Sequence, residues 1–182
     1  KTNSNPHACV SGGVTKYGFE PPFNLGIVID VSGSTKDPFG GSPTGDVNND
    51  GTSNSILDAE IASIIAVLQS IAKSPDLDNS NVDIGLVTFS TVATYHGRFS
   101  PLDPNDETKV NPTLLNVLTG LKANGYTNFD GALDEILKYY IEAPKLRDNL
   151  LFFLSDGIPN VPGNGDGEVA PRDSRGNIQY IN

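Results

Sequence analysis

An aspartate and two serines alternate directly after an apolar stretch, in the segment DVSGS that begins at Asp30. Asp30, Ser32 and Ser34 stand two residues apart, so a chain leaving a strand can turn their three oxygens toward one point, and Gly33 permits a sharp bend. Hard divalent cations take oxygen ligands, and Mg2+ keeps several waters in near-octahedral geometry. The pattern indicates a cation site with few negative charges, which would attract an acidic group from a partner. The alternative is an Asx-type turn with serine capping.

A second group of acids follows in a loop rich in Gly, Pro, Asn and Asp. Its segment DVNNDG matches the first six positions of an EF-hand calcium loop, in which positions 1, 3 and 5 bind the ion and a glycine at position 6 permits the turn. Asp46, Asn48 and Asp50 would be these ligands, and Thr52 would add its backbone carbonyl. The template then fails at position 12, where an EF-hand loop has a glutamate ligand and this chain has Leu57.

The acid that follows, Asp58, has two interpretations. It could be a further calcium ligand, or it could close a helix capping box with Ser55, with Asp in place of the usual Glu. We predict a Ca2+ site within the insertion of residues 35–54 and leave the role of Asp58 open between these two. A solvated turn rich in Asp and Asn is the alternative to the calcium site.

Apolar periodicity places these motifs at the ends of regular elements. Residues 25–30 are continuously apolar and β-branched, which is typical of a strand buried on both faces in a parallel sheet. Residues 82–90 and 149–157 predict further strands, and 91–99 predicts a short partner strand. Helical spacing predicts three helices: one over 55–73, one marked by Leu114, Val117, Leu118 and Leu121, and one starting near Asn128 and marked by Leu133, Ile136, Leu137 and Tyr140.

Strands that alternate with helices predict an α/β fold, with an open, mostly parallel, doubly wound (Rossmann-like) sheet and helices on both faces. Ligands of such sheets bind outside the carboxyl ends of the strands, where the acids of this chain lie. We expect an irregular lead-in over residues 1–22 and one domain over 23–182. Residues 161–182 of this domain form an irregular tail.

Three separated segments resemble the von Willebrand factor type A (vWA) family. DVSGS resembles the first segment of that family's metal-ion-dependent adhesion site (MIDAS), GYTNFDGAL (125–133) its threonine segment, and LLFFLSDGIPN (150–160) its later strand. The resemblance covers about residues 23–160 and implies vWA architecture. It also implies that Mg2+, or Mn2+ or Ca2+ in its place, is held by five residues: Asp30, Ser32, Ser34, Thr127 and Asp156.

The resemblance further implies an adhesion function, in which a carboxylate of a protein or cell-surface ligand completes the metal's coordination shell. Two features depart from the family pattern. The family normally continues with at least one more strand and helix after the segment that holds Asp156, whereas residues 161–182 show neither clearly. The family also enters its first helix shortly after the serines, whereas residues 35–54 intervene here.

The composition excludes several classes of function. The net charge is −10 and the 12 basic residues are scattered, so neither nucleic-acid binding nor binding to anionic lipid is expected. No apolar stretch approaches the ~20 residues of a membrane span, and Cys9 is the single cysteine, which excludes a disulfide within the chain. We expect a monomeric extracellular module of a longer cell-surface protein. The acidic composition and calcium-type loop favour a bacterial adhesin of the RTX type.

No enzyme motif is present: the glycine motifs that bind dinucleotides or phosphates are missing, as is the nucleophile elbow. His7 and His96 lie far in sequence from the serines, so no base is positioned to activate one. We therefore expect no enzyme. Two alternatives stay open, a vWA domain whose metals only stabilise the fold and a Mg2+ phosphohydrolase of the haloacid dehalogenase type. The latter needs a second acid where this chain has Ser32.

Overall fold

The centre of the fold is a four-stranded sheet with the strand order β3-β2-β1-β6. The central strand β1 (Phe23–Asp30) is parallel to both β2 (Val82–Phe89) and β6 (Asp148–Leu154). β3 (Ala93–Phe99), the short partner strand predicted over 91–99, pairs antiparallel with β2 at one edge and contains His96. The open, mostly parallel sheet predicted from the sequence is confirmed.

The computed structural model describes residues 22–157 and 159–160. The predictions for the lead-in and for the tail lie outside these residues, except that residue 22 belongs to the described part. The predictions for His7 and Cys9 also fall outside. Within the described part, no helix combines the length and the hydropathy that a membrane crossing requires.

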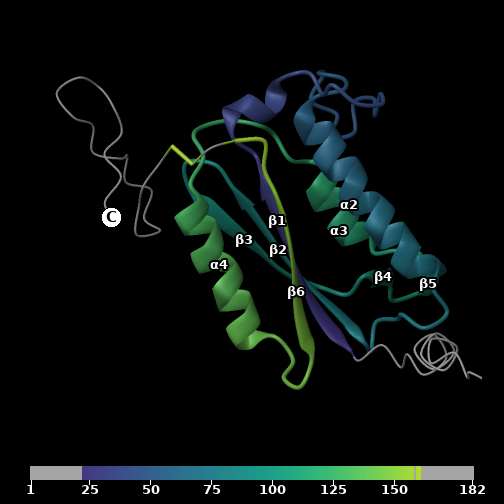
Figure 1. The fold of residues 1–182 in the computed structure, drawn as a ribbon. Helices are drawn as coiled ribbons and strands as arrows, with labels where there is room; N and C mark the ends of the chain where they lie inside the picture. The colour runs from purple at the N-terminus through teal and green to yellow at the C-terminus, as the bar shows by residue number, and fades with distance from the viewer. Residues whose placement is uncertain (1–21, 158, 161–182) are drawn as a thin grey trace, which may run out of the picture.

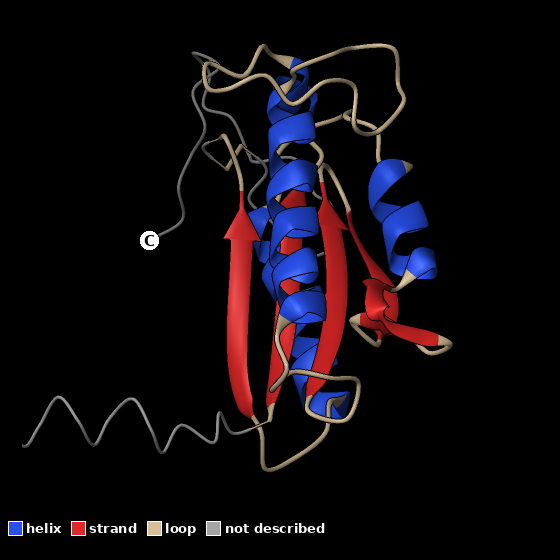
Figure 2. Ribbon diagram, turned by 90° about the vertical axis from the view of Figure 1, so that its right-hand side faces the viewer, coloured by secondary structure: helices blue, strands red, loops and turns tan. Residues whose placement is uncertain are grey.

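Helices cover both faces of the sheet, as the alternating pattern predicts. Helices α2 (Ile56–Lys73) and α3 (Pro112–Thr119) lie on one face, and α4 (Phe129–Glu142) lies on the other (Figure 1). Figure 2 shows α2 running along the sheet, with the long loop of residues 35–54 above its N-terminal end. A short 3-10 helix, η2 (Gly33–Lys36), follows β1 and packs against α2.

Alternating side chains of the strands supply two separate hydrophobic cores. Leu25, Ile27 and Ile29 of β1 pack in the core under α2 and α3. Val28 of β1 belongs instead to the core under α4, together with Val87 and Phe89 of β2, and the ring of Phe89 contacts those of Phe129 and Phe153. The strand buried on both faces, predicted for residues 25–30, is therefore confirmed.

Two details differ from the sequence prediction. The structure contains a small antiparallel hairpin, β4 (Leu102–Asp103) and β5 (Asp106–Val110), which packs against α2. Apolar periodicity did not indicate this hairpin because its strands are short and mostly polar. The strand predicted over 149–157 is also shorter: β6 ends at Leu154, and the residues after it form a turn beside β1.

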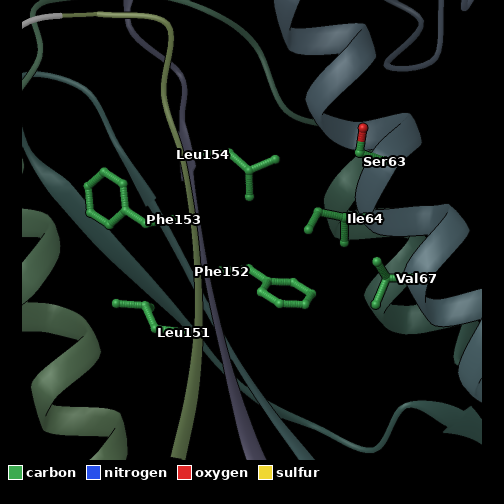
Figure 3. Close-up of a pocket in the computed structure, with 7 residues that line it drawn as sticks. All are labelled: Ser63, Ile64, Val67, Leu151, Phe152, Phe153 and Leu154. Atoms are coloured by element: carbon green, nitrogen blue, oxygen red, sulfur yellow. The ribbon is translucent and has the colours of Figure 1, made fainter.

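Strand β6 is an exposed edge within the described part of the chain, although its sequence is as apolar as that of a central strand. Leu150 and Leu151 are each 44% exposed. Phe152 and Leu154 point toward α2 and line an open groove of about 350 Å³ with Ser63, Ile64 and Val67, whereas Leu151 and Phe153 point to the opposite side (Figure 3).

The approach of α4 to the sheet gives a test of the packing. A β-carbon at Gly85 would lie less than 3 Å from the ring of Tyr139, which is fully buried and whose hydroxyl donates to Asp83. Gly85→Ala should therefore lower the free energy of unfolding in urea by about 1–3 kcal/mol. Gly40→Ala is the matched control, because no atom lies within 4 Å of its β-carbon position. Equal stability of the two variants would contradict this packing.

Candidate metal site at the carboxyl ends of the strands

The carboxylate of Asp30 ends β1 and is fixed by two hydrogen bonds. It is fully buried; Oδ1 accepts from the backbone N–H of Ser32 at 2.8 Å, and Oδ2 accepts from the hydroxyl of Ser155 at 2.6 Å. The first bond is an Asx-type turn, so this part of the alternative interpretation of DVSGS is present, whereas the side chain of Ser32, at the N-cap of η2, makes no capping hydrogen bond within the described residues. The turn does not compete with a metal site, because each carboxylate oxygen has further lone pairs.

The two serines of DVSGS connect Asp30 to the end of β6. The hydroxyls of Ser32 and Ser34 lie 3.2 Å apart, and the Ser34 hydroxyl donates to Oδ1 of Asp156 at 3.1 Å. Ser34 lies in the short helix η2, where its backbone carbonyl accepts from the N–H of Asp37 at 2.8 Å. Four of the five predicted ligands thus belong to one group of hydrogen-bonded side chains.

The fifth predicted ligand, Thr127, reaches the same place from the loop before α4. A β-carbon built on Gly157 would lie 3.6 Å from the Thr127 hydroxyl oxygen and 4.0 Å from that of Ser34. Both hydroxyls therefore lie close to the same point beside Gly157. The structure brings Asp30, Ser32, Ser34, Thr127 and Asp156 to one edge of the sheet, and these five residues are called the strand-end site below.

Backbone hydrogen bonds hold the Thr127 loop against its neighbours. The N–H of Gly33 donates to the carbonyl of Gly125 at 2.9 Å, and Gly125 has a φ of 84°, which favours glycine. Thr127 is paired twice with Asn160: its N–H donates to the Asn160 side chain at 2.8 Å, and its carbonyl accepts from the Asn160 N–H at 3.0 Å. These contacts fix the position of the Thr127 side chain, which is 3% exposed.

Three residues at the site were not predicted from the sequence: Ser155, Asn160 and Glu60. Ser155 and Asn160 act through the hydrogen bonds just described. Glu60 lies on α2 and is 8% exposed, and its Oε2 is buried without a hydrogen-bond partner among residues 22–157 and 159–160. A signal for Glu60 existed, because it is an acid on the same helical face as Leu57 and Ile64, both of which are buried.

Two acids at the site, Asp30 and Glu60, are buried, and this burial dominates their electrostatics. Burial raises the pKa of Asp30, the hydrogen bonds from Ser155 and Ser32 lower it, and the charge of Asp156 raises it again. Burial also raises the pKa of Glu60 to about 8, and the charges of Asp30 and Asp156 act in the same direction. A cation at this place would relieve the repulsion among these acids.

The residues of the strand-end site fit a hard divalent cation. Their donors are two carboxylates and three hydroxyls, all of them oxygens. In the part of the chain that the structure describes, no three His, Cys, Asp or Glu side chains converge as a metal cluster would. Any ion here would therefore depend on the hydroxyls as well as on the carboxylates. The buried Oε2 of Glu60 has no hydrogen-bond donor among the described residues.

The insertion of residues 35–54 forms a turn around Asp46. Oδ1 of Asp46 accepts from the N–H of Asp50 and Oδ2 from that of Gly51, each at 3.0 Å. Gly51 has a φ of 91°, as expected for the glycine position of the template. The Asn48 side chain donates to the Leu121 carbonyl at 3.0 Å, which ties the loop to the chain beyond α3.

Asp58 forms the capping box that was one of its two interpretations. Its Oδ2 accepts from the N–H of Ser55 at 2.9 Å, and its own N–H donates to the Ser55 hydroxyl at 3.1 Å. Its Oδ1 accepts from the N–H of Val47 at 2.7 Å, so Asp58 also fastens the insertion to α2. The N–H of Thr52 donates to Asp50. Calcium binding by Asp46, Asn48, Asp50, Thr52 and Asp58 stays a prediction.

Comparison with known proteins supports the assignment of the fold. The sequence profile of the von Willebrand factor type A domain matches residues 25–158. A mutant of the PilB minor pilin from Streptococcus sanguinis is structurally similar, with a TM-score of 0.58 and 19% identity over 88% of this chain and 34% of that chain. PilB itself gives a TM-score of 0.55 and 22% identity over 85% of this chain and 32% of that chain.

A third similar structure contains three N-terminal domains of the type V pili tip protein Mfa5 from Porphyromonas gingivalis. Its TM-score is 0.52, with 19% identity over 76% of this chain and 20% of that chain. This chain thus spans a fifth of the Mfa5 structure and about a third of each PilB structure. No curated protein matches the chain.

The raised pKa of Glu60 predicts how stability depends on pH without metal. The folded state keeps a proton that the unfolded state releases between pH 4.5 and about 8. The free energy of unfolding should therefore fall as the pH rises through this window, by at most about 1.4 kcal/mol per pH unit. Glu60→Gln should make this fall shallower in urea titrations with EDTA, while the exposed Glu142→Gln should not. An unchanged slope in Glu60→Gln would contradict the raised pKa.

Proposed function

Because the chain belongs to the von Willebrand factor type A family, we propose that it is an adhesion module that captures an acidic group of a partner through a divalent ion. The observation that carries this proposal is the convergence of Asp30, Ser32, Ser34, Thr127 and Asp156 at one edge of the sheet. Mg2+ is the ion we expect there, with Mn2+ or Ca2+ able to replace it.

The residues around the site orient the ligands for this role. Ser155 and the backbone of Ser32 hold both oxygens of Asp30, and Asn160 holds the loop of Thr127. A bound divalent ion would supply positive charge and an exchangeable coordination position. Three of the five ligand groups are uncharged hydroxyls, so part of that charge would remain available to a carboxylate of the partner.

The similar structures support a place at the cell surface for this chain. They come from a minor pilin and from a pilus tip protein, and we propose that this chain is likewise a module of a longer bacterial surface protein. Its partner would be a protein or another cell-surface ligand that presents a carboxylate. The proposed module acts as a monomer, without catalysis, nucleic-acid binding or membrane insertion. More narrowly, we propose that the longer protein is an adhesin of the RTX type.

Replacement of one hydroxyl ligand tests the metal-dependent function. Ser34→Ala removes an oxygen that contacts both Ser32 and Asp156, so the affinity for Mn2+ in calorimetric titrations should fall more than tenfold. Stability should change by only about 1 kcal/mol or less. The control is Ser70→Ala, whose exposed hydroxyl donates to the Ala66 carbonyl within α2. Metal binding retained by Ser34→Ala, with a large loss of stability, would favour a purely structural role.

The calcium proposal for the insertion has a separate test. Asp46→Asn replaces the carboxylate at position 1 of the template with an amide, which weakens a Ca2+ site strongly. In saturating Mg2+, added Ca2+ should raise the melting temperature of the original chain but not that of Asp46→Asn. The control Asp76→Asn, at an exposed position outside the insertion, should respond as the original chain does. An equal response of all three proteins to Ca2+ would contradict calcium binding at Asp46.

A further inference from the structure

Glu60 is held at the strand-end site by the packing of α2. It lies one turn into the helix, on the face that buries Leu57, Ile61 and Ile64 against the sheet. This end of α2 packs against η2, the short helix that carries Ser34. The position leaves Glu60 8% exposed, which is unusual for a glutamate that forms no ion pair with the described residues.

The carboxylate of Glu60 lacks the contacts that such burial normally requires. Its Oε2 has no hydrogen-bond partner, and no other carboxylate oxygen in the described residues is left buried and unpartnered. Burial of a carboxylate without a donor is costly, so such a group calls for a water or an ion that satisfies it. The charges that act on Glu60 are those of Asp30 and Asp156, which are both predicted ligands.

Glu60 does not approach these two aspartates closely enough to share an ion with them directly. The described residues contain no cluster of three acidic, histidine or cysteine side chains with the spacing of metal ligands. A water on the ion, by contrast, can bridge to a carboxylate that lies one layer further out. Mg2+ and similar ions keep several waters when protein ligands are few.

We propose that Glu60 is a positioning residue of the strand-end site, whose unpaired oxygen accepts a hydrogen bond from water held by the divalent ion. This inference rests on the proposed function and adds a residue to it. The negative charge of Glu60 increases the affinity of the site for the ion. Because it also offsets part of the ion's charge, Glu60 weakens the attraction of the bound ion for an anion.

Titration with MnCl2 tests this proposal in the full chain with Glu60→Gln, which keeps the size of the side chain and removes the charge. We expect about tenfold weaker Mn2+ binding, the lower end of the range for outer-shell carboxylates. At saturating Mn2+, acetate should bind more tightly to Glu60→Gln than to the original chain. The control Glu142→Gln, at the far end of α4, should match the original chain in both titrations.

A purely structural role predicts a different result. It would lower the melting temperature of metal-free Glu60→Gln and leave Mn2+ affinity unchanged, which would overturn the proposal. Our proposal predicts that the metal-free melting temperature is equal or higher, because a buried acid without a donor is removed. If Glu60→Gln does not fold, Glu60→Asp is the second variant, because it keeps the charge on a shorter side chain. It should bind Mn2+ more weakly than the original chain. An unchanged Mn2+ affinity of Glu60→Asp would overturn the proposal.

Two outcomes separate this inference from the proposed function. If the original chain binds Mn2+, Ser34→Ala does not and Glu60→Gln binds as well as the original chain, then the role of Glu60 alone is overturned. If the original chain itself binds no Mn2+, both the proposed function and the role of Glu60 are overturned.

Discussion

The hydrogen bond between Ser155 and Asp30 joins the ends of β6 and β1, and the arrangement of the strand-end site depends on this junction. The parallel register pairs Ile29 with Leu154, so Asp30 and Ser155 are the next residues of two adjacent strands. Asp156 then follows close enough to accept from Ser34. Two acids that are far apart in sequence are thereby held together, and both burial and the charge of Asp156 oppose the ionised form of Asp30. A divalent cation is the partner that would stabilise this arrangement.

The insertion of residues 35–54 is fastened to the elements around this site. Asp58 of α2 accepts from the N–H of Val47, and Asn48 donates to the Leu121 carbonyl. A few residues further, the N–H of Asn124 donates to the carbonyl of Val31, directly after β1. The insertion is thus connected to two of the three segments that carry the ligands, the one after β1 and the one before α4. Calcium, if it binds as we propose, would rigidify a loop with two attachments beside the strand-end site.

Much of the fold was predictable because local periodicity matched tertiary burial. The helix over 55–73 begins one residue later, at Ile56, with Ser55 as its cap, and the strand over 25–30 is buried on both faces. The apolar composition of β6 could not reveal that this strand is an edge, since periodicity reports the faces of a strand and not its neighbours. The hairpin β4–β5 was missed because it is short and largely polar.

The candidate site, too, was predictable from the sequence only in part. Asp30, Ser32 and Ser34 lie within one short motif, and resemblance to a family added Thr127 and Asp156. The contributions of Ser155, Asn160 and Glu60 depend on contacts between segments far apart in sequence, which a local pattern does not contain. Asp58 shows the opposite case, since a four-residue pattern already gave its capping box as one of two interpretations, and the structure contains that box.

The central claim is that five side chains from three segments form one divalent-cation site. It is tested most directly by an anomalous-difference map from a crystal of this chain grown with Mn2+. The account predicts a peak among Asp30, Ser32, Ser34, Thr127 and Asp156, with a water or a carboxylate from a neighbouring molecule completing the shell. A well-ordered crystal with saturating Mn2+ and no peak at this place would contradict it.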